Sequence, residues 1–155
     1  MNKIATRKAT IDDLDTINEI FRLSKSSWGY SDEFMDRCMA DYAITIEHIT
    51  ESAIYLLCVN DYVTGFYNFA LGEDGHPIEL DYFFLHPNYF GKGLGRKLWE
   101  SCLAVAKSLN LSEFILNSDP NAEGFYLGMG CEKIGEKESP IITGRKLPVL
   151  IYRLS

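Results

Sequence analysis

The sequence predicts a mixed α/β (α+β) fold whose sheet is not a regular doubly wound one. Three observations favour this class: apolar strand-like runs such as residues 53–59, segments of helical period such as residues 12–24, and an element order without regular strand–helix alternation. The 155 residues are 46% hydrophobic and 24% charged, which is typical of a globular domain and excludes disordered or fibrous classes. We therefore expect a single domain over residues 1–155.

The N-terminal region predicts one strand and two helices. Residues 4–10 are strand-like, and Thr10 with Asp13 resembles a capping box that begins a helix over residues 12–24. Ser31 begins a second helix. The expected apolar face of this second helix consists of Phe34, Met35, Cys38 and Tyr42.

The middle of the chain predicts three strands and a long helix. Residues 53–59 and 63–71 are joined by Asn60-Asp61, which favours a tight hairpin turn, and a third strand follows over residues 78–85. A glycine-rich loop then leads into the helix. Its apolar positions keep the 3.6-residue period: Leu94, Leu98, Cys102, Val105, Ala106 and Leu109.

Shorter elements complete the predicted order. A turn at residues 72–77 separates the hairpin from the third of these strands. A short strand at residues 114–116, a short helix at residues 121–127 and closing strands at residues 132–136 and 149–154 follow the long helix. The resulting order, strand-helix-helix-strand-strand-strand-helix-strand-helix-strand-strand, is not that of a regular doubly wound sheet.

Charge and composition exclude several classes of function. The formal net charge of −7 argues against nucleic-acid binding, because a surface that follows phosphates is basic. The apolar runs are shorter than the ~20 residues of a membrane-spanning helix, and the N-terminus lacks the apolar segment of a secretory signal. We expect a cytoplasmic protein without a membrane partner. No metal site is predicted, because these residues lack ligand spacing: Cys38, Cys58, Cys102, Cys131, His48, His76 and His86.

The glycine loop carries the clearest functional signal. Gly91, Gly93 and Gly95 let the backbone approach a ligand closely, and N–H groups at the start of a helix attract anions. We expect a phosphate or pyrophosphate there, although glycines also serve simple turns. The string G-K-G-L-G-R is not a P-loop. Nor is it a dinucleotide fingerprint, because Arg96 stands where the third glycine is needed, so NTPases and dehydrogenases are disfavoured.

Two longer strings indicate a family. Residues 85–98 read L-H-P-N-Y-F-G-K-G-L-G-R-K-L, and residues 119–130 read D-P-N-A-E-G-F-Y-L-G-M-G. They closely resemble the coenzyme A loop and the N-x-x-A-x-x-F-Y-x-x-x-G segment of GNAT-family N-acetyltransferases, and residues 7–14 resemble that family's first strand and helix. The resemblance implies a GNAT fold, in which a mixed, mostly antiparallel central sheet is flanked by helices and splayed strands form a groove for coenzyme A. It also implies acetyl-CoA as cosubstrate and acetyl transfer to a primary amine.

Two carboxylates on one strand suit acid–base chemistry. Acyl transfer to an amine needs a base for the amine, a donor for the thioester oxygen and a proton for the leaving thiolate. Strict alternation along residues 78–85 predicts Glu79, Asp81, Phe83 and Leu85 on one face, with Leu80, Tyr82 and Phe84 on the other. Burial and proximity of like charges would raise one of the two carboxyl pKa values toward neutrality.

The resemblance also implies roles for single residues. Glu79 matches the family's general base, Asp81 is the second choice, and Tyr126 matches the general acid. The backbone N–H of Leu85 is implied to polarise the thioester carbonyl. Solvated carboxylates and an ordinary core tyrosine remain the alternatives. The implied cofactor site comprises Phe84, Leu85, Phe90, Gly91, Lys92, Gly93, Leu94, Gly95, Arg96, Asn117, Asn121 and Tyr126.

Two positions depart from the family pattern. Phe90 stands where Arg or Gln is usual and Asp119 where Asn is usual, which puts polar contacts to the cofactor in doubt, although Asn117 and Asn121 lie near Asp119. The acceptor wall is expected in the helical region, where core packing competes with ligand binding for the aromatic residues Trp28, Tyr30, Phe34 and Tyr42.

Three functions stay open on the sequence. The first is direct acetyl transfer to a small amine, without a cysteine nucleophile. The second is a coenzyme A-binding regulatory module without turnover, which retention of Glu79 and Tyr126 argues against. The third is acetylation of a protein or peptide. The segment over residues 139–148 is expected either to line the acceptor site or to form a homodimer contact.

Overall fold

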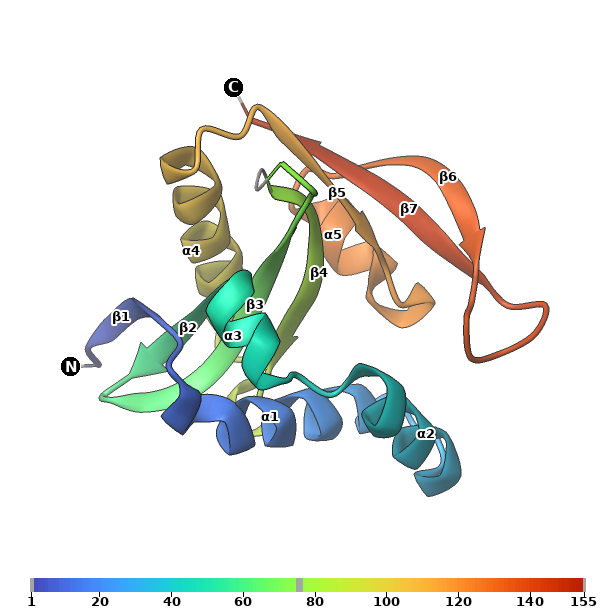
Figure 1. Cartoon of the computed structure of the whole chain (residues 1–155), viewed down its shortest axis with the longest axis horizontal. Coiled ribbons are helices and arrows are strands. Elements are labelled where there is room, and N and C mark those ends of the chain that lie inside the picture. The colour runs from blue at the N-terminus through green and yellow to red at the C-terminus, as the bar shows by residue number, and fades with distance from the viewer. Residues whose placement is uncertain (1, 75–76, 155) are drawn as a thin grey trace.

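Seven strands form one mixed sheet in the computed structural model, which describes residues 2–74 and 77–154 (Figure 1). Their order across the sheet is β1-β2-β3-β4-β5-β7-β6, and neighbouring strands are antiparallel except for β4 and β5. The strands are β1 Ile4–Lys8, β2 Ala53–Val59, β3 Tyr62–Leu71, β4 Pro77–Leu85, β5 Glu113–Asn117, β6 Glu132–Glu138 and β7 Lys146–Arg153.

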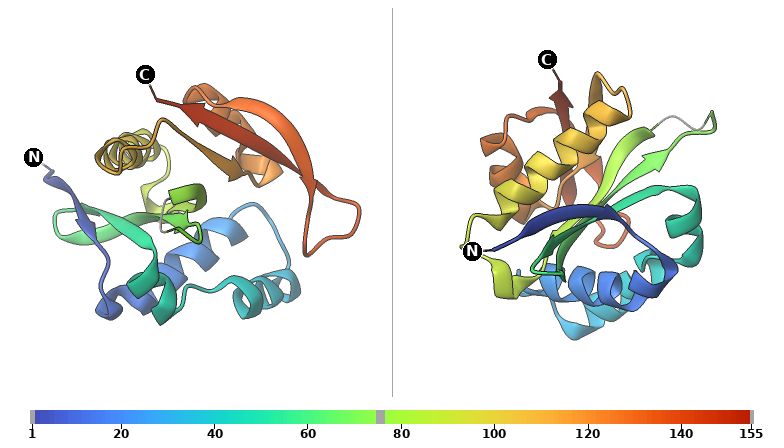
Figure 2. Two further views of the ribbon diagram at one scale, coloured as in Figure 1. Left: turned by 45° about the horizontal axis from the view of Figure 1, so that its top comes forward. Right: turned by 90° about the vertical axis from the view of Figure 1, so that its left-hand side faces the viewer.

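Helices cover both faces of the sheet (Figure 2). They are α1 Leu14–Ser26, α2 Asp32–Tyr42, α3 Ile46–Glu51, α4 Leu94–Ser108 and α5 Glu123–Gly128. The first three lie on one face, where Ile17, Ile20 and Met35 are centres of one apolar cluster. The other two lie on the opposite face, where Leu98 and Trp99 belong to a second cluster. Both clusters include side chains from the central strands, because alternate strand residues point to opposite faces.

The local signals for turns and caps are confirmed. Asn60 and Asp61 have φ angles of 52° and 71°, the left-handed pair that a two-residue hairpin turn needs. The Asp13 carboxylate accepts the backbone N–H of Thr10 at 2.8 Å, as in the expected capping box. Ser31 caps α2, because its hydroxyl accepts the Phe34 N–H at 3.1 Å.

One helix was missing from the expected order. The helix α3 has six residues, too few to show a helical period, and Thr45 caps it by accepting the His48 N–H. The expected turn at residues 72–77 includes residues 75 and 76, which lie outside the described residues. Within the described chain, no helix is long and apolar enough to cross a membrane.

The sheet opens between its fourth and fifth strands. β4 and β5 run parallel but pair at a single position, Glu79 opposite Ile115. Figure 1 shows the two strands diverging from that point. Their facing backbone groups beyond it therefore lack a strand partner, which opens a groove in the middle of the sheet.

A β-bulge interrupts β4. Tyr82 lies opposite Asn68 and Leu80 lies opposite Phe69, so Asp81 has no partner on β3. The strict alternation expected for this strand is therefore wrong. The extra residue shifts the alternation by one position, so that Leu80 shares a face of the sheet with Phe83 and Leu85 instead of Tyr82 and Phe84. Leu80, Phe83 and Leu85 pack with the cluster around α4. Tyr82 and Phe84 pack with the cluster around α1.

Candidate active site

Asp81 lies at the bulge of β4 with its carboxylate half-buried. The Asn68 Nδ2 of β3 donates a hydrogen bond to Asp81 Oδ1 at 2.9 Å. Burial raises the pKa of Asp81 from 3.8 to about 7; the Asn68 hydrogen bond lowers it, and the nearby charge of Glu79 raises it further. A carboxyl group with this pKa can accept or release a proton near neutral pH.

Glu79 is the second carboxylate of the strand. The Asn117 Nδ2 donates to Glu79 Oε2 at 3.4 Å, and Asn117 is the last residue of β5. This contact spans the only paired position of β4 and β5 in the described sheet. Glu79 thus lies where the groove begins.

The edge of β4 turns backbone groups into the groove. The His86 N–H donates to the Thr64 carbonyl of β3 at 2.7 Å, and Leu85 lies opposite Gly65. In an antiparallel pair this pattern makes Leu85 and Gly65 a non-hydrogen-bonded pair. The N–H and C=O of Leu85 therefore point away from β3, toward the side where β5 has diverged.

The glycine loop presents a row of unpaired donors. No backbone N–H from residues 91–96 donates a hydrogen bond within the described part of the chain, and the first helical bond of α4 runs from Lys97 to Gly93. Gly91 and Gly93 have φ angles of 74° and 77°, which favour glycine. Free N–H groups at the start of a helix, together with the helix dipole, are an arrangement that can hold an anion.

Tyr126 of α5 lies among aromatic rings. Its ring centroid is 5.8 Å from that of Phe83, 5.9 Å from Trp99 and 5.4 Å from Phe125. Burial raises the pKa of Tyr126 well above its ordinary value of 10, so the phenol keeps its proton. Its hydroxyl makes no hydrogen bond with any described residue and is available to a ligand.

The two carboxylates, Leu85, Tyr126 and the loop residues Gly91 and Gly95 line one cavity of about 730 Å³. Glu79, Asp81 and Leu85 contribute from β4, and Tyr126 contributes from α5. The remaining walls come from α1, α2, the segment between them, and the β6–β7 loop. Those walls include Phe21, Ser24, Lys25, Trp28, Phe34, Cys38, Tyr42, Ile141 and Arg145.

Asp119 joins three segments at one end of this cavity. Its Oδ2 accepts the Lys25 Nζ at 3.0 Å and the Tyr30 hydroxyl at 2.7 Å, and its Oδ1 lies 3.4 Å from Arg145. Burial alone would raise the pKa of Asp119, but the charge of Lys25 and the hydrogen bonds it accepts outweigh burial and lower it. Arg145 also donates to the Tyr30 hydroxyl. The carboxylate is therefore ionised and ties the β6–β7 loop to α1.

The sequence matches a family model over most of its length. The model of the acetyltransferase (GNAT) family matches residues 14–130, which include the groove, the glycine loop and Tyr126. The chain belongs to the GNAT acetyltransferase family. No curated protein sequence matches this chain at a significant level.

Solved structures share the GNAT fold at low sequence identity. The PaiA N-acetyltransferase of Thermoplasma acidophilum, in complex with coenzyme A, is 18% identical with a TM-score of 0.80, over 98% of this chain and 99% of that one. A GNAT acetyltransferase of Staphylococcus aureus is 17% identical with a TM-score of 0.72, over 99% and 100%. YncA of Salmonella typhimurium, with its cofactor acetyl-CoA, is 20% identical with a TM-score of 0.67, over 99% and 95%.

The GNAT cavity gathers most of the residues singled out in the sequence. Glu79 and Asp81 line it together with Phe84, Leu85, Phe90, Gly91, Gly95, Asn117, Asn121 and Tyr126. Lys92, Gly93, Leu94 and Arg96 are not in its lining. The side chain of Leu94 packs in the core, so only its backbone can face a ligand. Among the described residues, no group of His, Cys, Asp or Glu is arranged to hold a metal.

Sequence reasoning missed two residues of this site. Asn68 and Lys25 have no motif around them, and each reaches its partner only through the fold. Asn68 is an ordinary strand residue whose bond to Asp81 depends on the bulge. Lys25 is 94 positions from Asp119 in the chain. Asp119 did carry a signal in the sequence, because it stands where the family usually has Asn.

Proposed function

We propose that this GNAT protein transfers the acetyl group of acetyl-CoA to a primary amine by direct attack in a ternary complex. One observation carries the proposal. A carboxyl group with a pKa near 7 and a neutral buried phenol line a single cavity together with Gly91 and Gly95, two residues of the loop whose backbone N–H groups bond to none of the described residues. These are the base, anion-binding and acid groups that acyl transfer to an amine requires.

The groove fits acetyl-CoA, which supplies the thioester. The free N–H groups of residues 91–96 would bind its pyrophosphate at the start of α4. The exposed backbone edge of β4 at Leu85 would bind the pantetheine arm, and its N–H would stabilise the charge that develops on the thioester oxygen. Phe90 offers an apolar surface beside this loop, because it is 45% exposed and lines the cavity.

Asp81 is the proposed general base. A bound amine enters as an ammonium ion and loses one proton to the Asp81 carboxylate, directly or through water, before its nitrogen attacks the thioester carbon. A base acts best when its pKa lies near the working pH, which favours Asp81 over Glu79. Glu79 is proposed to attract the ammonium ion and to hold the pKa of Asp81 up through its charge.

Tyr126 is the proposed general acid. When the carbon–sulfur bond breaks, its phenol donates a hydrogen bond and its proton to the departing thiolate. The second amine proton then restores the phenol through solvent. Burial keeps Tyr126 protonated across the working pH range, and its hydroxyl has no competing partner among the described residues.

Two features support direct attack on a small acceptor. Cys38 lines the cavity, but burial raises the pKa of its thiol, which leaves it protonated and a poor nucleophile. The β6–β7 loop is held against the helices, since Arg145 contacts Asp119 and Arg37 donates to the Ile141 carbonyl at 3.4 Å. A loop fixed in this way beside the acceptor end would favour a small amine over a protein chain.

The test is thiol release from acetyl-CoA with a panel of small primary amines and a lysine peptide. We expect turnover with at least one small amine. Tyr126→Phe removes only the hydroxyl and should lower kcat by about 10²-fold while acetyl-CoA binding is kept. Acetyl-CoA binding without turnover of any amine or peptide would instead indicate a regulatory module.

A further inference from the structure

The walls of the cavity carry opposite charges. Glu79 and Asp81 lie on the β4 wall, where the amine is proposed to react. Lys25 and Arg145 lie on the wall formed by α1 and the β6–β7 loop, with side chains 18% and 22% exposed. Lys137 of β6 adds a third cation to the lining. A ligand in this cavity thus meets carboxylates on one side and cations on another.

Lys25 and Arg145 together carry more positive charge than the single Asp119 carboxylate neutralises. One carboxylate pairs with both, so the cluster has a net positive charge. Lys25 uses one of its three N–H donors on Asp119. Arg145 uses one terminal nitrogen, while its other terminal nitrogen and Nε bond to none of the described residues. A forked set of unused donors matches a carboxylate.

These donors are separate from the proposed coenzyme A site. The phosphates of acetyl-CoA are assigned to the N–H groups at the start of α4. Lys25, by contrast, lies in the last turn of α1, and Arg145 directly precedes β7. Apolar side chains line the cavity on the side of α1, α2 and the β6–β7 loop. They are Phe21, Trp28, Phe34, Tyr42 and Ile141.

We infer that the acceptor is an amino acid with an apolar side chain, whose ammonium group faces Asp81 and whose carboxylate binds Lys25 and Arg145. The inference rests on the proposed function, because it names the acceptor of the same site. Charge complementarity supplies the direction: the negative wall fits the ammonium and the positive wall the carboxylate. The aromatic side chains of the lining provide an apolar surface for the side chain of the amino acid.

The first test compares matched acceptors that differ only in the carboxylate. Phenylalanine is paired with phenethylamine, and leucine with 3-methylbutylamine. We expect kcat/KM for each amino acid to exceed that of its amine by about tenfold or more, the value of one hydrogen bond to a charged group. Equal kcat/KM values for the amino acid and its matched amine would overturn the inference, while the proposed function would still hold.

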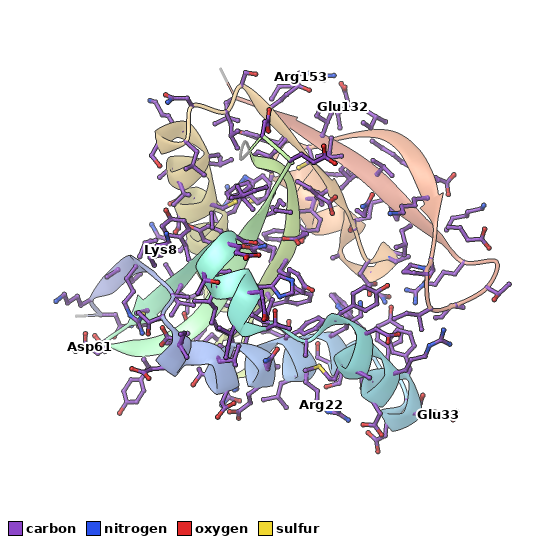
Figure 3. The ribbon with its side chains drawn as sticks, viewed as in Figure 1. Lys8, Arg22, Glu33, Asp61, Glu132 and Arg153 are labelled. Atoms are coloured by element: carbon purple, nitrogen blue, oxygen red, sulfur yellow. The ribbon has the colours of Figure 1, made fainter. Side chains whose placement is uncertain are left out.

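Variants then locate the carboxylate site. The readout is kcat/KM for the amino acid divided by kcat/KM for its matched amine. Arg145→Met and Lys25→Met should each lower this ratio by about tenfold, and Arg145→Lys should lower it less than Arg145→Met does. Arg22→Met is the matched control, because Arg22 lies on the same helix as Lys25, pairs with Asp36 at 2.8 Å and points away from the sheet (Figure 3). It should leave the ratio unchanged. A ratio that survives both cavity variants contradicts the inference.

Binding gives a readout that needs no turnover. Calorimetry with the coenzyme A-loaded protein should detect phenylalanine, and Arg145→Met should weaken that binding by about tenfold. If phenylalanine binds in this way but no acceptor is acetylated, the result supports the carboxylate site at Lys25 and Arg145 and contradicts the proposed acetyl transfer. If neither amino acid binds nor is acetylated, the inference is wrong. Retained coenzyme A binding shows that each variant is folded.

Discussion

Asp81 owes its chemistry to its immediate surroundings. The bulge removes its partner on β3, burial raises its pKa to about 7, and Glu79 adds a neighbouring negative charge. Asn68 suits both protonation states of such a group. Its Nδ2 donates to the carboxylate. Its buried Oδ1 has no partner within the described part of the chain and can, after rotation of the amide, accept from the carboxylic acid. The pair is therefore suited to taking up a proton and releasing it.

The pH profile of Asp81→Asn tests the assignment of the base. Catalysis requires the carboxylate, so the wild-type rate should rise with pH through about 7, the pKa to which burial raises Asp81. Asp81→Asn should lower kcat by about 10²–10⁴-fold and abolish this rise of the rate with pH, the acid limb of the profile. The measurement is kcat/KM for acetyl-CoA at saturating amine between pH 5 and 9.

Glu79→Gln is the matched control for that profile. It removes the neighbouring charge that raises the Asp81 pKa, so the limb should persist and move to lower pH. Loss of the limb in Glu79→Gln, with its retention in Asp81→Asn, would assign the base to Glu79 instead.

The start of α4 is the element on which the proposed anion site depends. The N–H groups of residues 91–96 have no partner among the described residues, because helical bonding begins only at Lys97. Gly93 caps the helix in the left-handed region, with a φ of 77°. Gly95 serves another purpose: a Cβ there would lie 3.3 Å from the Phe125 ring, so glycine lets α4 approach α5. One loop thus combines a packing role with the proposed ligand binding.

Gly93→Ala tests the loop as a binding element. A methyl group at Gly93 has no heavy atom within 4 Å, so the variant should fold, with about 1 kcal/mol of backbone strain. We expect the Kd for acetyl-CoA to rise about tenfold or more, because the donors lose their alignment. Gly144→Ala is the control, since Gly144 has a φ of 82° and equally open space in the β6–β7 loop. An equal loss of affinity in both variants would implicate strain rather than the loop.

At the scale of the molecule, the opening of the sheet makes the site. Two apolar clusters stabilise the two faces, while β4 and β5 separate after one paired position. Residues of both β4 and β5 line the cavity, and Figure 1 shows these two strands separating between the β1–β4 and β5–β7 parts of the sheet. Because the ligand would contact both halves, its binding should stabilise the folded chain as a whole.

Thermal unfolding tests this coupling between ligand and fold. Coenzyme A or acetyl-CoA at 100 times its Kd should stabilise the protein by about 2.7 kcal/mol, which corresponds to about 5–10 °C in Tm. NAD and ATP, at the same concentrations, should have no comparable effect, because the loop lacks their fingerprints. Absence of a shift with either coenzyme A species would mean that Phe90 and Asp119 have disabled the site.

Local signals in the sequence were sufficient for most elements and for the backbone geometry of the glycine loop. The Asn60-Asp61 turn, the Ser31 cap and the glycines at residues 91–95 act through their own backbone geometry, which depends little on distant residues. The family strings, confirmed by the match over residues 14–130, supplied the fold and the general chemistry for the same reason. A six-residue helix such as α3 lies below the length at which periodicity is visible.

Only the tertiary structure decided how the two charged walls of the cavity are built. The bulge at Asp81 depends on the register between β3 and β4, and that register turns Phe83 and Leu85 to the face opposite Tyr82. The raised pKa of Asp81 comes from burial by the folded chain. Lys25 and Arg145 meet at Asp119 from distant parts of the sequence. Burial and long-range pairing are properties of the packed molecule, which is why no local pattern contains them.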